Sequence, residues 1–316
     1  MNPTSNLSEA DQQPIGYDRG RLVPDHSIRL PLDDAGLRQG ILVSDLLRTY
    51  NGKTRFLEQH LKRLGAGLQT VSIRVPEAEI RQAIADVARH NTEREPAGSD
   101  LQVSVLVTPG SPGDDGQYPQ PTLVVTGRRL PFSTIDRGYR EGIGMASVET
   151  REIPGACIPR HLKHRNRIHY WIAEQEARRV DPSARAILRD TAGLVCEGTI
   201  SGIAIVTPDG QLVAPPADQT LGSVSLEFAG QLLAARGKTL QYRPLSLNDL
   251  GGCREMLSLS SSMGVYPVTR FNGEPVGHGH PGEVFQQLLA DWSRETGVDL
   301  AAQAARFATR AEAGPI

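Results

Sequence analysis

The segment HLKHRNRIHY, residues 161–170, packs one lysine, two arginines and three histidines around three apolar side chains and one asparagine. Such a stretch has three interpretations: a solvated basic face, a nucleic-acid patch, or the surroundings of one reactive lysine. Most basic runs are solvated faces. The choice therefore depends on the composition of the chain and on motifs elsewhere in it.

The composition argues against a general nucleic-acid or membrane-surface binder. Of 316 residues, 39% are hydrophobic and 22% are charged, and 34 basic against 36 acidic side chains leave a net charge of −2. Such a binder needs an excess of positive charge, and no apolar run approaches the roughly 18 residues of a membrane span. The three cysteines, Cys157, Cys196 and Cys253, are far apart, which predicts no disulfide framework or metal site and favours a reducing cytoplasm.

The hydrophobic periodicity predicts an α+β protein of two domains. The polar segment MNPTSNLSEADQQP lacks a hydrophobic signal core and predicts a disordered tail. Residues 128–142 lack clear periodicity and are the candidate linker. We expect a tail and first hairpin in residues 1–27, a small α/β domain in 28–135 and a larger domain in 136–316.

Turn signals and apolar stripes predict the individual elements. Asn51-Gly52 indicates a type I′ turn between two strands, and Pro76 suits the first turn of a helix. The expected helices cover 56–68, 76–91, 167–179, 225–237 and 281–297. The expected strands lie in 16–25, 40–56, 101–108, 121–127, 143–150, 184–216, 255–262 and 266–277.

Several common catalytic motifs are missing from the sequence. It contains no Gly-x-x-x-x-Gly-Lys-Ser/Thr loop, no His-Glu-x-x-His and no Gly-x-Ser-x-Gly elbow. The serines in 258–262 have no base beside them in sequence, which disfavours hydrolase chemistry. The basic segment that carries Lys163 stays open at this point: a lysine amine that is buried or near other cations can lose its proton and attack an aldehyde, but most such runs are solvated.

Four segments, FLEQHLKRL, IPRHLKHRNRIHYWIAEQEARR, LRDTAGLVCEGTISGIAIV and LSLSSSMGVYPV, occur in an order that resembles the class IV aminotransferases. These fold-type IV pyridoxal-phosphate (PLP) enzymes include branched-chain aminotransferases, D-amino-acid and R-selective amine transaminases, and aminodeoxychorismate lyase. The resemblance runs from about residue 28 to 295. It implies a small α/β domain, a larger PLP-binding domain with a mixed, barrel-like sheet and flanking helices, and a homodimer.

The resemblance also implies roles for particular residues. Lys163 takes the place of the Schiff-base lysine, and Glu197 takes that of the carboxylate opposite the pyridine nitrogen, which maintains the ring as an electron sink. An anion site for the cofactor phosphate needs amides, hydroxyls and a cation. The residues that match the family's phosphate and ring contacts are Arg63, Ser261, the amides of Val224 and Ser225, and Leu221.

The substrate end departs from the family. Ser44 stands where an aromatic residue is usual, and Pro109 stands where the D-amino-acid enzyme and the lyase carry an arginine. Gly202 and Leu226 replace a common asparagine and arginine. Because Pro109 offers no donor, we expect a roomier pocket. Either loop amides and hydroxyls near Ser261 and Ser262 hold the substrate carboxylate, or the substrate needs no carboxylate.

The resulting functional hypothesis is a PLP-dependent transaminase that moves an amino group from a branched-chain or apolar amino acid, or an amine, to a 2-oxo acid. The alternative is β-elimination of the aminodeoxychorismate lyase type. LKHRNRI favours it, whereas Pro109 and Gly198, where the lyase has cysteine, weaken it. A third hypothesis is a diverged, non-catalytic PLP-binding protein. Retention of both Lys163 and Glu197 disfavours it, since a binding module needs no electron sink.

Overall fold

In a computed structural model, residues 13–308 are described, so most of the expected N-terminal tail lies outside the described residues. The chain forms two compact units. Unit 1 comprises the chain up to Leu130 together with His164–Asn166, and unit 2 comprises Pro131–Lys163 and the chain from Arg167 onward. This division lies five residues before the domain boundary expected at 135. Independent folding of the two units stays a prediction.

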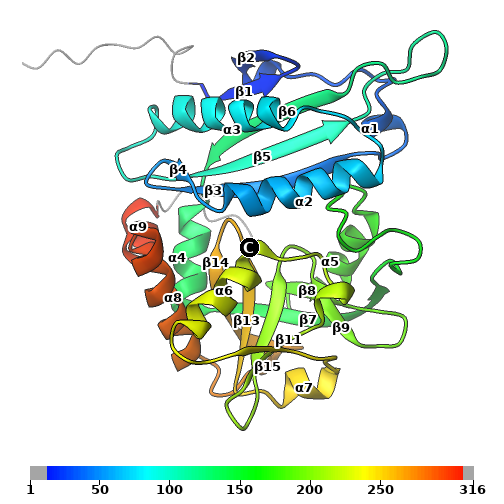
Figure 1. The fold of residues 1–316 in the computed structure, drawn as a ribbon. Coiled ribbons are helices and arrows are strands. Elements are labelled where there is room, and N and C mark those ends of the chain that lie inside the picture. The colour runs from blue at the N-terminus through cyan, green and yellow to red at the C-terminus, as the bar shows by residue number, and fades with distance from the viewer. Residues whose placement is uncertain (1–12, 309–316) are drawn as a thin grey trace, which may run out of the picture. The chain divides into compact units, whose positions relative to one another are not determined.

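Unit 1 is built on an antiparallel sheet that has six strands in the described residues, in the order β2-β1-β6-β5-β3-β4 (Figure 1). β1 pairs with β6, so the first hairpin belongs to this sheet instead of forming a segment apart. Its elements are β1 (Ile15–Asp18), β2 (Arg21–Pro24), α1 (Ala35–Arg38), β3 (Val43–Tyr50), β4 (Lys53–Thr54), α2 (Leu57–Thr70), α3 (Glu77–Thr92), β5 (Leu101–Thr108) and β6 (Thr122–Arg129).

Local sequence explains most of unit 1. Asn51 and Gly52 both have positive φ, 51° and 73°, as the predicted type I′ turn between β3 and β4 requires. β5 alternates buried and half-buried residues, and the buried faces of α2 and α3 pack on the sheet. Pro76 is the N-cap of α3, one position before the helix. The predicted turn, the strand at 101–108 and the two helices are therefore confirmed.

Unit 2 is built on a mixed sheet with nine strands in the described residues, in the order β12-β11-β10-β13-β14-β7-β8-β9, with β15 beside β14. β7 runs parallel to both β8 and β14, whereas β13 is antiparallel to its neighbours. Its strands are β7 (Ile143–Arg151), β8 (Ala184–Arg189), β9 (Val195–Gly198), β10 (Gly202–Val206), β11 (Leu212–Ala214), β12 (Leu240–Tyr242), β13 (Glu255–Ser260), β14 (Gly264–Phe271) and β15 (Glu274–Pro275).

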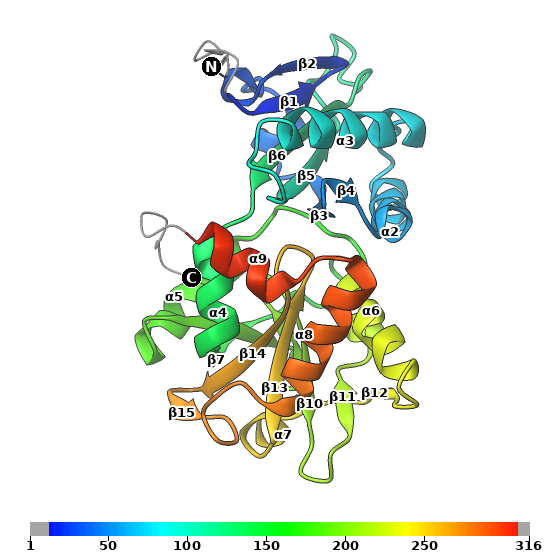
Figure 2. The same ribbon diagram turned by 90° about the vertical axis from the view of Figure 1, so that its left-hand side faces the viewer.

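The helices of unit 2 flank this sheet, and Figure 2 shows α8 alongside β13 and β14. They are α4 (Phe132–Glu141), α5 (Ile168–Val180), α6 (Val224–Ala234), α7 (Leu247–Gly251), α8 (Glu283–Thr296) and α9 (Leu300–Phe307). No helix among the described residues has the length and apolar character needed to cross a membrane.

The expected linker over 128–142 is wrong, because most of it forms α4. Phe132, Ile135 and Tyr139 are buried along one side of this helix. Tyr139 stacks edge-on against Tyr266 of β14 at 5.4 Å and donates a 2.6 Å hydrogen bond to the carbonyl of Met263. The apolar spacing of three and four was present in the sequence, but only three residues carry it. α7, α9 and β12 were likewise too short to be predicted.

α5 is held closely against β7 and β8. The contact surface consists of small side chains, which let helix and sheet approach: Ala146, Val148, Ala173, Ala177, Ala184, Ala186 and Leu188. Glu176 accepts hydrogen bonds from the amides of Glu149 and Thr150 at 2.8 and 3.1 Å. This packing fixes the start of α5, immediately after the basic segment 161–167 that carries Lys163.

Candidate functional site

Lys163 lies in an irregular segment between β7 and α5. A turn closes before it, with the Leu162 amide donating to the Pro159 carbonyl at 3.0 Å. The next three residues, His164–Asn166, belong to unit 1, where the Arg165 amide donates to the Leu42 carbonyl at 2.9 Å. At the start of α5, Arg167 donates to the Thr199 carbonyl at 3.2 Å. The backbone on either side of Lys163 is therefore anchored by hydrogen bonds.

Glu197 is a buried carboxylate in β9, only 8% exposed, opposite Leu188 of β8. The amide of Leu221 donates a long hydrogen bond, 3.4 Å, to its Oε2 atom. Burial and the nearby charge of Glu152 raise the pKa of Glu197 to about 7, against the opposing effects of Lys163, the Leu221 amide and Arg160. Unit 2 thus brings together two residues that the sequence analysis assigned to the cofactor, Lys163 and Glu197.

A second buried carboxylate, Glu152, follows the end of β7. His169 Nε2 lies 3.4 Å and Arg160 Nη1 3.6 Å from its Oε1 atom. Burial would raise the pKa of Glu152, but His169, the Ile153 amide and Arg160 together hold it below its usual range. The phenol of Tyr170 faces both carboxylates, and burial, Glu197 and Glu152 raise the pKa of Tyr170 far above its ordinary value.

The N-terminus of α6 lies near Glu197, because the amide of Leu221, three residues before the helix, donates to the Glu197 carboxylate. Ser223 is its N-cap, and its hydroxyl accepts a 3.2 Å hydrogen bond from the Leu226 amide. Val224 and Ser225 are the first two helical residues, whose amides have no partner inside a helix. Both side chains are buried. This first turn therefore presents backbone donors and the positive end of the helix dipole, a suitable environment for an anion.

Ser261 and Ser262 lie in the turn between β13 and β14. β13 is antiparallel to β10, which follows Glu197 by one turn. Ser258 of β13 donates a 2.7 Å hydrogen bond to the hydroxyl of Ser201, which ties β13 to the Glu-Gly-x-x-Ser motif. The serine turn is thus connected, through Ser258 and Ser201, to the segment that follows Glu197.

In unit 1, Arg63 of α2 is held by Asp45 of β3. Arg63 Nε and Nη2 donate to the two Asp45 oxygens at 3.0 and 2.6 Å, and His60 Nδ1 lies 2.9 Å from Asp45 Oδ1. Burial would raise the pKa of Asp45, but Arg63 and His60 hold it well below its usual range. Ser44, the preceding residue, is fully buried, and its Oγ has no hydrogen-bond partner among residues 13–308.

Pro109 begins the loop after β5, whose path is closely constrained. The Thr108 hydroxyl donates to Asp34 at 2.9 Å and accepts from the Gly110 amide at 3.1 Å. Gly110 has φ 87°, and a Cβ atom there would lie 2.1 Å from the Gln120 carbonyl oxygen. Only glycine fits this position, so the backbone around Pro109 is fixed and offers no side-chain donor at residue 109.

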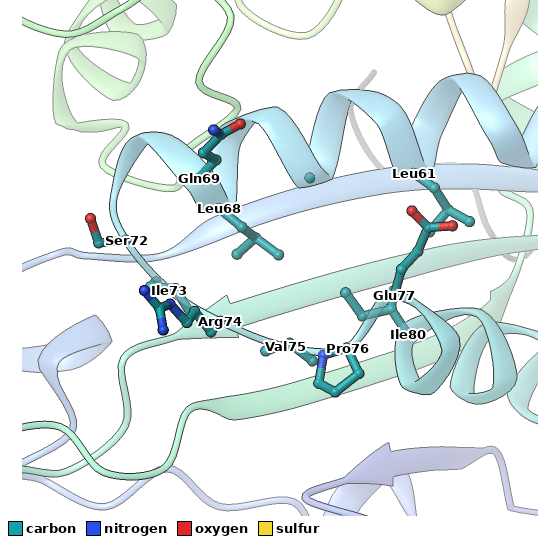
Figure 3. A pocket seen from close by; sticks show the side chains of 11 residues that line it. Leu61, Leu68, Gln69, Ser72, Ile73, Arg74, Val75, Pro76, Glu77 and Ile80 are labelled. Atoms are coloured by element: carbon teal, nitrogen blue, oxygen red, sulfur yellow. The ribbon is translucent and has the colours of Figure 1, made fainter.

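An open cleft of about 710 Å³ in unit 1 contains none of the predicted site residues. Figure 3 shows it between α2 and the segment that leads into α3, with Leu68 and Ile73 among its apolar walls and Arg74 and Glu77 at its edge. Its apolar side chains belong to the core of unit 1. The predicted site therefore does not coincide with this cleft.

Comparison with known proteins decides the family. Residues 42–271 match the family described as amino-transferase class IV. The chain belongs to this family. It is 26% identical over 279 residues to a Methanocaldococcus jannaschii protein provisionally named a branched-chain-amino-acid aminotransferase, covering 86% of this chain and 93% of the relative. It is 24% identical over 272 residues to D-alanine aminotransferase of Bacillus licheniformis, covering 85% and 92%.

The fold comparison agrees. The branched-chain amino acid aminotransferase from Escherichia coli superimposes with a TM-score of 0.78 at 20% identity, over 90% of this chain and 95% of the other. The expected two-domain α+β fold with a curled, mixed sheet is confirmed. This class IV aminotransferase is a PLP-dependent enzyme acting on amino acid and 2-oxo acid substrates.

The residues of unit 2 fit PLP chemically. The cofactor offers an aldehyde, a pyridine nitrogen and a phosphate. Lys163 supplies an amine, Glu197 supplies a buried carboxylate with a raised proton affinity, and the first turn of α6 supplies amide donors. Glu197 links the three segments: the Leu221 amide before α6 donates to it, and the charge of Lys163 acts on it.

Sequence reasoning missed two sets of charged residues. Asp45 interrupts the apolar run ILVSDLL, and this is a signal of a buried, paired charge that was available in the sequence. Glu152, His169 and Tyr170 gave no comparable signal. Their proximity results from the packing of α5 on β7, which brings residues from both ends of the basic segment together.

Proposed function

We propose that this aminotransferase transfers an amino group from an apolar amino acid, or from an amine, to a 2-oxo acid, with Lys163 as the residue that holds the cofactor covalently. The observation that carries the assignment of roles is that Glu197 is buried in unit 2 within electrostatic reach of Lys163, whose charge opposes the rise in the Glu197 pKa. A buried carboxylate whose pKa is about 7 can share a proton with a ring nitrogen near neutral pH.

The other groups of the proposed site hold the cofactor. Val224 and Ser225 donate their amides to the phosphate, and Ser261 adds a hydroxyl. Leu221 packs on the ring face while its amide orients Glu197. In unit 1, Asp45 fixes the orientation of the Arg63 guanidinium through two hydrogen bonds, and the family resemblance implies that Arg63 would be the cation for the phosphate.

Two residues handle protons. When bound, PLP supplies an electron sink for the charge left at the substrate α-carbon. With PLP bound, Lys163 Nζ would be the base that accepts the α-proton of the substrate and the acid that returns it. Glu197 holds the proton at the ring nitrogen throughout. Its burial excludes water that would otherwise compete for this hydrogen bond.

The substrate end follows from Ser44, Pro109 and Ser262. Pro109 has neither a side-chain donor nor a backbone N–H, and Ser44 is small. Without an arginine at residue 109, any carboxylate contact comes from hydroxyls and amides near Ser261 and Ser262. This favours substrates recognised by apolar contacts. The Methanocaldococcus jannaschii relative, which is named for branched-chain amino acids, agrees with this preference.

We expect turnover of the best branched-chain or larger apolar L-amino acid, or of an amine, to exceed that of D-alanine and D-glutamate by about 10- to 100-fold in kcat/KM. The lost arginine–carboxylate contact is worth roughly 1.5–3 kcal/mol. Single-turnover reactions of the loaded enzyme with a panel of L- and D-amino acids and amines measure this directly. Turnover of D-alanine as fast as that of the best L-substrate would contradict the proposal. D-alanine is included in the panel because one relative is a D-alanine aminotransferase.

β-Elimination of the aminodeoxychorismate lyase type rests on the LKHRNRI segment alone and is less well supported than transamination. The relatives carry aminotransferase names, and the cysteine that typifies the lyase is replaced by Gly198. In the described structure a Cβ atom at residue 198 would lie 2.9 Å from both Met145 Cε and Ser201 Oγ. The position is therefore packed for glycine, and a cysteine would require its neighbours to move.

We further propose a homodimer that buries one face of α5, in a reducing cytoplasm where the free thiols Cys157, Cys196 and Cys253 persist. Four large apolar residues of this helix are exposed, and three of them lie in its first two turns: Ile168 by 70%, Trp171 by 67% and Ile172 by 48%. Their spacing of three and four places them on one side of α5. A contiguous apolar face of this kind is typical of a subunit contact.

Trp171→Asp should convert the dimer into the monomer, so that the measured mass falls from about twice the chain mass to the chain mass of 34.2 kDa. Burying a carboxylate in an apolar contact costs several kcal/mol. Val180→Asp is the matched control, because Val180 is also exposed on α5 but lies about 180° around the helix from Trp171. Light scattering after size exclusion reports the mass. A Trp171→Asp dimer as stable as wild type would exclude this face as the interface.

A further inference from the structure

Glu152 is a buried ionised group to which the proposed function gives no role. It follows the last residue of β7 and is 6% exposed. Its Oε1 atom accepts a 3.0 Å hydrogen bond from the Ile153 amide, whereas its Oε2 atom is buried and makes no hydrogen bond of ordinary geometry in the described part of the chain. A buried carboxylate with an unsatisfied oxygen is costly to keep and calls for a role.

The partners of Glu152 keep its negative charge in place. His169 of α5 and Arg160 of the preceding loop lie 3.4 and 3.6 Å from Oε1. All three side chains are largely shielded from solvent, so water screens their interactions little. Burial opposes ionisation of Glu152, but His169, the Ile153 amide and Arg160 outweigh it and lower the pKa of Glu152.

Glu152 lies beside the strand pair that carries Glu197. Its amide donates a 2.9 Å hydrogen bond to the Arg189 carbonyl of β8, and the preceding residue of β8, Leu188, pairs with Glu197 of β9. After burial, Glu152 makes the largest contribution to raising the pKa of Glu197 to about 7. The charged and polar groups around Glu197 come from each neighbouring segment. They are Glu152 after β7, Arg160 in the loop before the basic segment, Lys163 in that segment, Tyr170 of α5, Cys196 of β9 and the Leu221 amide before α6. Glu152 is the carboxylate among them.

We propose that Glu152 is a positioning residue, a fixed buried anion held by Arg160, His169 and the Ile153 amide, which acts through Glu197 to retain the proton shared between Glu197 and the cofactor ring nitrogen. This role rests on the proposed function of Glu197. It adds a second carboxylate to the ring-nitrogen side of the site. Glu152 stays ionised, and Glu197 makes the hydrogen bond to the ring nitrogen.

The sign of the effect is fixed by Coulomb's law. A negative charge nearby favours every protonated form around it, so Glu152 raises the pH at which Glu197, or the proton that it shares with the ring nitrogen, titrates. Removing the charge of Glu152 lowers that pH. In the loaded enzyme, the proton would then be lost at lower pH, and the basic limb of the kcat profile would move downward.

The test compares Glu152→Gln with wild type in two measurements. In the cofactor-free protein, carbon-13 NMR of labelled glutamate carboxyls, assigned with Glu197→Gln, follows the Glu197 midpoint, which we expect near 7 in wild type and roughly one unit lower in Glu152→Gln. In the loaded enzyme, the basic limb of kcat should move in the same direction. Glu149→Gln is the control, because Glu149 lies three residues earlier with an exposed side chain.

Two further variants retain the charge of Glu152 and serve as its controls. Glu152→Asp retains the charge and should restore the wild-type midpoint and limb. His169→Gln removes a partner of Glu152 but leaves the carboxylate with Arg160 and the Ile153 amide, so Glu152 stays ionised near pH 7 and the Glu197 midpoint should stay near that of wild type. A purely structural role of Glu152 would lower stability in Glu152→Gln without moving either midpoint.

The outcomes separate this inference from the proposed function. An unchanged Glu197 midpoint in Glu152→Gln overturns the coupling. A shifted midpoint with an unmoved kcat limb overturns the positioning role. Undiminished turnover of Glu197→Gln is a different failure, since it removes Glu197 from the reaction and with it the proposed function, whatever the cofactor-free titration shows.

Discussion

Lys163→Ala should abolish transamination, lowering kcat by about 10⁴-fold or more. The substitution removes the amine that we propose holds the cofactor and moves the α-proton. General acid–base catalysis by one group is alone worth roughly 10²–10⁴-fold, and covalent attachment adds to it. Stopped-flow measurement of a half-reaction with the best amino donor gives the rate without interference from product release.

The matched control is Lys238→Ala. The chain has four lysines, at positions 53, 62, 163 and 238, and Lys238 is exposed in unit 2 with a single weak contact to Gln287. It should retain wild-type kcat. Lys163→Ala with more than a few per cent of wild-type turnover would show that another group moves the proton and would remove Lys163 from the centre of the mechanism.

Glu197→Gln should lower kcat by about 10²–10³-fold, the usual cost of removing one preorganised electrostatic contact from a buried site. The neutral amide fills the same space but cannot balance the positive charge of a protonated ring nitrogen. Covalent attachment of the cofactor at Lys163 should persist, because Glu197 acts on the opposite end of the ring. Comparison of kcat with the fraction of attached cofactor separates these effects.

The control for this second variant is Glu274→Gln, an exposed carboxylate in β15 that lies outside the proposed site. Wild-type kcat in Glu197→Gln, with full cofactor attachment, would mean that the carboxylate does not support the ring nitrogen. Loss of attachment together with kcat would instead indicate that Glu197 mainly maintains the local structure around β9 and the Leu221 amide.

Much of the fold could be predicted because strong local signals agree with the tertiary structure. The Asn51-Gly52 turn, the alternation in β5 and the long amphipathic helices α2, α3 and α8 each carry their own pattern. α4 was missed because its burial depends on partners far away in sequence, such as Tyr266 of β14 and Phe307 of α9. Short elements stabilised mainly by tertiary packing carry little local information.

The candidate site was predictable to a similar degree. Lys163 and Glu197 stand in sequence motifs, and unit 2 brings them together. The partners that tune them do not stand in motifs. Glu152 and His169 are seventeen positions apart and meet only because α5 folds back on β7. Pairings of this kind depend on three-dimensional packing and leave no periodicity or spacing in the chain.

Borohydride reduction of the PLP-loaded enzyme, followed by tryptic digestion and mass spectrometry, tests the central claim most directly. The four lysines of the chain make the outcome unambiguous. We predict a single phosphopyridoxyl group, on the peptide that contains Lys163, and none after prior reaction with an amino donor that displaces the lysine. Stoichiometric labelling of Lys53, Lys62 or Lys238, or no label in an enzyme that has bound PLP, would contradict the assignment.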